Sequence, residues 1–213
     1  MGRLLGGSLL GKLHGDLIFG RRVRVLTEQL STLIPAGAEV LDIGAGSGII
    51  AERLGVLRPD LTLSGIDTLV RPQTAIPIRW FNGREIPLED RSIDVALFVD
   101  VLHHTDDPTI LLREAARVAR QAIVLKDHTR EGWLAGSTLR LMDYVGNAHF
   151  GVVLPYHYWR LREWHEAFAK LDLTVAEWRS SLGLYPKPAS WLFDRRLHFV
   201  ARLTPAGRIR EVA

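Results

Sequence analysis

The chain has 213 residues and no cysteine. This length fits one domain with a full hydrophobic core, and the lack of cysteine excludes disulfides, zinc–thiolate sites and cysteine nucleophiles. The net charge is only +3 and the basic residues form short doublets, so the pattern predicts no nucleic-acid partner. A cysteine-free chain fits a reducing compartment, and a cytoplasmic location is expected.

The first 21 residues mix Leu and Gly with Arg3, Lys12, His14 and Asp16. Their apolar runs are too short for a signal peptide, and no stretch of the chain approaches the roughly 20 apolar residues that cross a bilayer. We expect residues 1–21 to form a loosely amphipathic leader, for which a weak contact with a membrane surface stays open.

Beyond the leader, strand and helix periodicities alternate along the chain. Residues 22–33 have apolar positions at helical spacing and stop before Pro35. Further helices are expected at 49–57, 107–119, 133–146 and 159–171, and strands at 38–43, 61–66, 76–80, 93–99, 122–126, 173–178 and 197–203. The order predicts an α/β fold, Rossmann-like and doubly wound, whose mostly parallel seven-stranded sheet has an antiparallel C-terminal edge.

The pattern predicts a single domain over residues 1–213. After the leader come a core at 22–127, a cover on the acceptor side at 128–158, and a C-terminal helix with strands at 159–213. The link at 67–75 is short for a crossover helix, which with its loops takes about 10–12 residues or more. An irregular connection is expected there.

A glycine-rich loop, Gly44 to Gly48, follows the first expected strand. Its G-x-G-x-G spacing lacks the third glycine of a dinucleotide fingerprint, which would fall at Ile49, and no Gly-Lys-Ser/Thr follows. Asp42, two residues earlier, would repel a pyrophosphate but favour a ligand with an ammonium and a sulfonium. Asp67 ends the second strand, where an acid can accept the hydroxyls of a ribose.

Several segments in this order resemble class I methyltransferases that use S-adenosylmethionine (SAM). Residues 40–48 (VLDIGAGSG) resemble the first motif and residues 65–67 (GID) the second. Residues 82–88 resemble the segment GDAEELPF, residues 92–94 with 101–104 resemble SFD…VLHH, and residues 111–118 match L-x-E-x-x-R-V. The similarity is to the methyltransferase-11 (ubiquinone/menaquinone-type) superfamily and covers roughly residues 38–127.

The resemblance implies SAM as the cofactor and S-adenosylhomocysteine (SAH) as its product. Asp42 and the glycine loop would hold the methionine part, Asp67 the ribose, and the amide oxygen of Asn82 the adenine amino group. Asp100 would face the methionyl end and the acceptor. The expected cofactor-binding residues are Asp42, Gly44, Ala45, Gly46, Gly48, Asp67, Thr68, Asn82, Gly83 and Asp100.

Methyl transfer from a sulfonium is an in-line displacement that depends mostly on positioning, and a base is needed only where the acceptor loses a proton. Asp100, Asp127 and His128 are the catalytic candidates, the last two because they are expected to follow the fifth strand. His103 and His104 are further bases of the chain. These two are adjacent and would point about 100° apart on a helix, so no metal site is expected.

Aromatic residues are concentrated in the last third of the chain. In the expected cover they predict a pocket for an apolar or aromatic small molecule, with Tyr144, His149, His157 and Tyr158 as substrate contacts. The same aromatic residues could instead close a small core.

The leading hypothesis is a small-molecule methyltransferase with an oxygen or carbon acceptor. An adenine- or glutamine-type nitrogen acceptor loses support because no Asn-Pro-Pro-Tyr follows the fourth strand. Two alternatives stay open. One is a regulatory SAM-binding protein without activity. The other is an enzyme dependent on NAD, which Asp42 and the loop spacing disfavour. The oligomeric state is left open.

Overall fold

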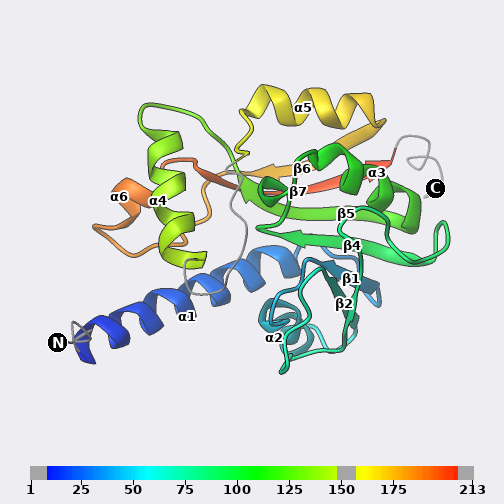
Figure 1. The fold of residues 1–213 in the computed structure, drawn as a ribbon, viewed down its shortest axis with the longest axis horizontal. Helices are drawn as coiled ribbons and strands as arrows, with labels where there is room; N and C mark the ends of the chain where they lie inside the picture. Colours follow the sequence, from blue (N-terminus) through cyan, green and yellow to red (C-terminus); the bar gives the residue numbers. More distant parts are fainter. Residues whose placement is uncertain (1–8, 148–156, 206–213) are drawn as a thin grey trace, which may run out of the picture.

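The computed structural model describes residues 9–147 and 157–205. A seven-stranded sheet in the order β3-β2-β1-β4-β5-β7-β6 forms the centre of the molecule (Figure 1). Strands β1 to β5 pair in parallel, whereas β7 is antiparallel to both β5 and β6. The strands are β1 Glu39–Ile43, β2 Thr62–Asp67, β3 Ile78–Trp80, β4 Ile93–Val99, β5 Ala119–His128, β6 Leu173–Arg179 and β7 His198–Pro205. The predicted fold class is confirmed.

Helices cover both faces of the sheet (Figure 1). Leu26 and Leu30 of α1 and Leu54 of α2 pack against one face of the sheet, and residues of α3 and α5 pack against the other. The helices are α1 Leu9–Ser31, α2 Ile49–Leu57, the short 3-10 helix η1 Leu102–His104, α3 Pro108–Val118, α4 Ala135–Asn147, α5 Leu161–Lys170 and α6 Ser190–Phe193. No helix in the described ranges is both long and apolar enough to cross a membrane.

Three features differ from the sequence prediction. Helix α1 begins at Leu9, inside the expected leader, and continues unbroken to Ser31. The short elements η1 and α6 were not expected. Strand β5 ends at His128, because β7 pairs with it to its last residue. The prediction that Asp127 and His128 follow the fifth strand was therefore wrong, since both lie within it. The irregular link between β2 and β3 is confirmed.

The first turn of α3 is capped by Asp107. Its Oδ1 accepts the backbone N–H of Thr109 at 2.9 Å and the Thr109 hydroxyl at 2.6 Å. Asp107→Ala should therefore lower the free energy of unfolding by about 1 kcal/mol, as measured in urea. The neighbouring Asp106→Ala is the control, and equal losses in both variants would mean that the cap contributes nothing.

Candidate active site

The glycine loop lies between β1 and α2 with its glycines in the left-handed region. The φ angles of Gly44, Gly46 and Gly48 are 74°, 60° and 76°. A Cβ on Gly44 would lie 2.6 Å from Cγ2 of Val101, and a Cβ on Gly48 would lie 2.7 Å from Cγ1 of Ile76. The loop is thus packed closely on two sides, and larger residues at its ends would force it to move.

Asp67 connects the end of β2 to this loop. Its Oδ2 accepts the backbone N–H of Gly46 at 2.7 Å, and its Oδ1 accepts that of Leu69 at 2.8 Å. A carboxylate has about four lone-pair positions, so two further donors can bind. A Cβ on Gly46 would meet nothing nearer than the Arg71 guanidinium at 3.8 Å. These residues therefore fit a ligand that has two hydroxyls and lies close to the loop backbone.

Asp42 is the buried acid of β1, with 3% of its surface exposed. Burial first, and then the charge of Asp67, raise the pKa of Asp42 to about 7. A cation bound beside these two carboxyl groups would relieve their repulsion. The pair therefore suits a ligand that carries an ammonium and a sulfonium.

The residues expected to meet the adenine lie together. A Cβ on Gly83 would stand 3.0 Å from Cγ2 of Thr68, which brings the loops after β2 and β3 into contact. Oδ1 of Asn82, however, accepts the backbone N–H groups of Arg84 at 2.9 Å and Glu85 at 2.8 Å. In this arrangement both lone pairs of the Asn82 oxygen are used by the turn, so a bond from this oxygen to the adenine amino group would compete with the turn. The NH₂ of Asn82 is the group left for a ligand.

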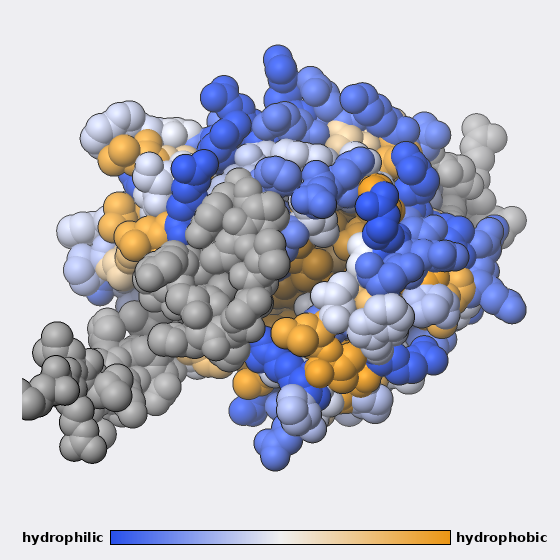
Figure 2. All heavy atoms as spheres, viewed as in Figure 1, coloured by the Kyte–Doolittle hydropathy of each residue, from blue (hydrophilic) through white to orange (hydrophobic). Residues whose placement is uncertain are grey.

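Apolar side chains lie exposed beside these loops. Leu69 is 57% exposed and Trp80 is 66% exposed. In Figure 2 apolar side chains gather at the surface below the grey segment, in the region of α2 in Figure 1. Exposed apolar groups at the ends of β2 and β3 fit a flat, uncharged ring such as an adenine.

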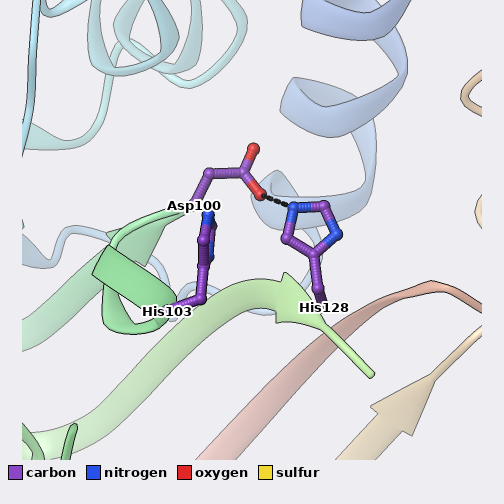
Figure 3. Close-up of side chains that lie close together, drawn as sticks. All are labelled: Asp100, His103 and His128. Carbon is purple, nitrogen blue, oxygen red and sulfur yellow. Dashed lines mark ion pairs between the residues drawn. The ribbon is translucent and has the colours of Figure 1, made fainter. Parts of the chain in front are cut away.

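Asp100 stands at the end of β4, in a left-handed backbone conformation with φ 59°. Its carboxylate is ion-paired with Arg22 of α1 and with Lys126 of β5, whose side chain is fully buried. His128 Nε2 lies 3.1 Å from Oδ1 of the same carboxylate, as the dashed line in Figure 3 shows. The Asp100 carboxylate thus links α1 and β5 to the end of β4 through ion pairs.

Neither Asp100 nor His128 has a pKa that suits a general base. Burial alone would raise the pKa of Asp100, but Lys126 and then Arg22 hold it well below its usual range. Burial and the Lys126 charge lower the pKa of His128 to about 4. A group with so low a pKa is a weak proton acceptor near neutral pH, so the charges around Asp100 and His128 favour ion pairing over the role of a base.

Asp127 is fully buried on β5 and bonds to His103 of η1, with 2.7 Å between Asp127 Oδ1 and His103 Nδ1. The same carboxylate accepts the backbone N–H groups of His128 at 2.8 Å and Leu102 at 3.1 Å. Burial would raise the pKa of Asp127, yet the interaction with His103 leaves it lowered. Asp127 therefore ties the end of β5 to η1 through His103 and the Leu102 backbone.

Two of the predicted substrate contacts lie beside this cluster. Tyr158 is buried and stacks on the ring of His103, with centroids 5.5 Å apart and planes 27° apart. His157 is exposed, and its Nδ1 lies 3.1 Å from the Thr105 carbonyl oxygen. The side chain of Tyr144 and the whole of His149 lie outside the described residues.

Among the residues that the structure describes, Asp100, His103 and His128 each offer one potential metal ligand, and the three atoms lie within 4.8 Å of one another (Figure 3). Lys126 and Arg22 already bind both oxygens of Asp100. A divalent cation would therefore meet two positive charges, and the arrangement favours these two side chains over a metal.

Comparison with known proteins places this geometry in a family. The model of a methyltransferase domain matches residues 17–177. The chain belongs to this methyltransferase family. An uncharacterized methyltransferase of Mycobacterium tuberculosis is 28% identical over 193 residues, which are 86% of each chain. The 27-O-demethylrifamycin SV methyltransferase of Amycolatopsis mediterranei is 30% identical over 45% of this chain and 40% of its own.

Solved structures agree on the fold. A SAM-dependent methyltransferase of Aquifex aeolicus superposes with a TM-score of 0.57 at 16% identity, over 85% of this chain and 88% of its own. Together with the family match, this identifies the chain as a class I SAM-dependent methyltransferase. The family and the fold also imply SAM as the cofactor of this methyltransferase.

Proposed function

We propose that this methyltransferase binds SAM at the glycine loop and transfers the methyl group to a hydroxyl or carbon of a small apolar or aromatic molecule. The proposal rests mainly on one observation: Val101, one residue after Asp100, packs directly on Gly44. This contact places the start of η1, and with it the polar cluster around Asp100, beside the cofactor loop.

Different residues of the chain would hold different parts of the cofactor and the acceptor. When bound, SAM supplies an electrophilic methyl carbon on its sulfonium. The loop backbone and Asp67 would hold the nucleoside, and Asp42 would hold the charged methionine end. The acceptor would lie beyond β4 and β5, where Tyr158 and the buried imidazoles exclude water. The oxygen acceptor is supported by the similarity to a methyltransferase whose name specifies an O-demethylated substrate.

SAM should bind with micromolar-range affinity in calorimetry, and NAD should not bind. Asp67→Ala should weaken SAM binding by about 1–3 kcal/mol, because a charged hydrogen-bond acceptor for the ribose is lost. Asp60→Ala is the matched control, since Asp60 precedes β2 and pairs with Arg58 at the opposite end of that strand from Asp67. NAD binding as tight as that of SAM, or equal SAM affinities in both variants, would contradict the cofactor assignment.

The acceptor class is tested with SAM that carries a labelled methyl group. A panel of phenols, aliphatic alcohols, β-dicarbonyl compounds, amines and a short RNA is incubated with the full chain. Label in the hydroxyl or carbon compounds supports the proposal. Label only in the RNA or only in the amines overturns it, and SAM binding without transfer to any of them favours the regulatory alternative.

A further inference from the structure

We propose that the outer surface of α4 and α6, together with the loop before α4, docks on a membrane whose lipids carry negative charge. The exposed apolar residues of this α4–α6 face are Trp133, Leu134, Leu141, Trp191 and Leu192. Its exposed basic residues are Arg130, Arg140, Lys187, Arg195 and Arg196. The docking is independent of the acceptor class proposed above.

Contacts between the segments make these residues one continuous surface. Nη2 of Arg195, just after α6, donates to the Thr138 hydroxyl of α4 at 3.3 Å, and Nε of the same residue donates to the Leu192 carbonyl oxygen at 3.1 Å. The stem of Arg130 lies against α4, since a Cβ on Gly136 would stand 3.6 Å from Cδ of Arg130. Figure 2 shows apolar side chains at the left of the molecule, where Figure 1 places α4 and α6.

Two tryptophans are the most exposed apolar residues of the face. Trp133 is 83% exposed and Trp191 is 71% exposed. Such a ring is stabilised at the boundary between lipid tails and headgroups, where its body lies among apolar groups and its N–H reaches polar ones. A protein partner would have to offer a separate pocket for each ring, whereas the fluid interior of a bilayer adapts to both.

The charge of the described face is positive. Glu131 accepts the backbone N–H of Leu161 at 2.9 Å, and half-buried Asp194 accepts that of Tyr185 at 3.1 Å. The side chain of Asp143 lies outside the described residues. The exposed basic groups outnumber these acids, and they lie among apolar side chains, as in surfaces that bind anionic lipids. A second copy of this chain would bring the same positive groups together in a symmetric interface, which their repulsion disfavours.

The inner side of α4 connects this face to the predicted acceptor side. Ala135 and Leu139 of α4 form a buried cluster with Tyr158 and Leu197. Tyr158 is one of the predicted substrate contacts. Docking would therefore hold the acceptor side of the enzyme next to the lipid surface.

The first test measures binding of the full chain to lipid vesicles. Binding to vesicles of phosphatidylcholine with phosphatidylglycerol should exceed binding to phosphatidylcholine alone. It should weaken as the salt concentration rises from about 0.05 M to about 0.5 M, because salt screens the attraction. No binding to the anionic vesicles at low salt overturns the proposal, and so does binding that is equal for both lipids and insensitive to salt.

The second test removes the aromatic rings. Trp133→Ser/Trp191→Ser should lower the partition coefficient into anionic vesicles about tenfold or more, because the rings no longer enter the apolar boundary. Trp80→Ser removes an exposed tryptophan from the β3 edge of the sheet and is the matched control for vesicle binding. Lipids with brominated tails should quench the tryptophan fluorescence of the control but not that of the double variant. Equal binding losses, or quenching that persists in the double variant, would place the membrane contact elsewhere and overturn the proposal.

The third test removes charge and leaves every apolar side chain of the face in place, so it also decides the question if the tryptophan variant folds poorly. Lys187→Gln/Arg196→Gln should weaken binding roughly fivefold for each charge removed. Arg113→Gln/Lys170→Gln, on α3 and at the end of α5 toward the opposite end of the molecule in Figure 1, is the matched control and should bind like the unaltered chain. Circular dichroism confirms that each variant folds, and equal losses in both pairs contradict a specific face. A dimer in solution that Trp133→Ser/Trp191→Ser converts to a monomer, without vesicle binding, would assign the face to a second copy instead.

Discussion

Asp42→Asn should make the cofactor-free protein more stable at pH 8 and less able to bind SAM. Because burial and Asp67 raise the pKa of Asp42 to about 7 in the folded state, the folded protein binds the proton more tightly than the unfolded chain, whose carboxyl has a pKa near 3.8. The contribution to stability is full below pH 3.8 and is lost as the pH rises through 7. At pH 8 the ionised Asp42 therefore destabilises the fold.

The size of the stability gain follows from how far the pKa of Asp42 is raised. One pKa unit corresponds to about 1.4 kcal/mol and the pKa of Asp42 rises from 3.8 to about 7, so the asparagine variant should gain on the order of 4 kcal/mol at pH 8 and less than about 1 kcal/mol at pH 4. Unfolding in urea at both pH values measures this difference. A variant whose gain is the same at pH 4 and pH 8 would show that the carboxyl charge is not its cause.

SAM affinity should move in the opposite direction. Loss of the carboxylate beside the ammonium and sulfonium should weaken binding about tenfold or more in calorimetry. Asp94→Asn is the control, and its expected change in stability has the opposite sign. Arg120 lowers the pKa of Asp94 to about 2, so its removal should destabilise the protein at pH 8 without changing SAM affinity. Unchanged SAM binding in Asp42→Asn would mean that Asp42 does not face the cofactor.

The cofactor side could be predicted from the sequence because its parts are local. The glycine loop follows β1 directly, and the acid that ends β2 is identified by its strand. Left-handed glycines and strand-end acids leave a recognisable spacing. The use of the Asn82 oxygen was missed, since the turn that occupies it needs only the next three residues and competes with any ligand.

The acceptor side depends on distant pairs and could not be predicted in the same way. Arg22 reaches Asp100 from 78 positions away, and Asp127 meets His103 across 24 positions. Strand β5 extends to His128 because β7 returns antiparallel beside it, which no local pattern indicates. The alternation of β5 then decides that Lys126 and His128 share one face and Asp127 takes the other. Given that strand end, the pairing of Asp127 with a histidine after β4 could have been inferred.

The largest loss of stability is expected from Asp100→Asn. The variant would leave Lys126 fully buried without its main anionic partner, with Arg22 still close by. Breaking a buried pair by removing one partner typically costs about 3–5 kcal/mol, because the remaining charge is not compensated. Urea unfolding at pH 7 measures this cost. Asp60→Asn, at the pair with Arg58 near the surface, is the control and should lose much less stability than Asp100→Asn, because solvent screens that pair.

The double variant Asp100→Asn/Lys126→Met distinguishes the effect of an uncompensated buried charge from the effect of altered side-chain packing. It should recover most of the stability, because no buried charge is left at this position. Burial already lowers the pKa of Lys126, and loss of Asp100 should lower it further in the folded state. The unfolded chain then binds more protons, so the stability of Asp100→Asn should rise with pH between 7 and 10, whereas that of the double variant should not. Two results would contradict this expectation: a loss of stability in Asp100→Asn no larger than in the surface control, or a loss that does not change with pH. Either would mean that the charge of Lys126 does not depend on Asp100. The argument from charge against a metal at this site would then fail as well.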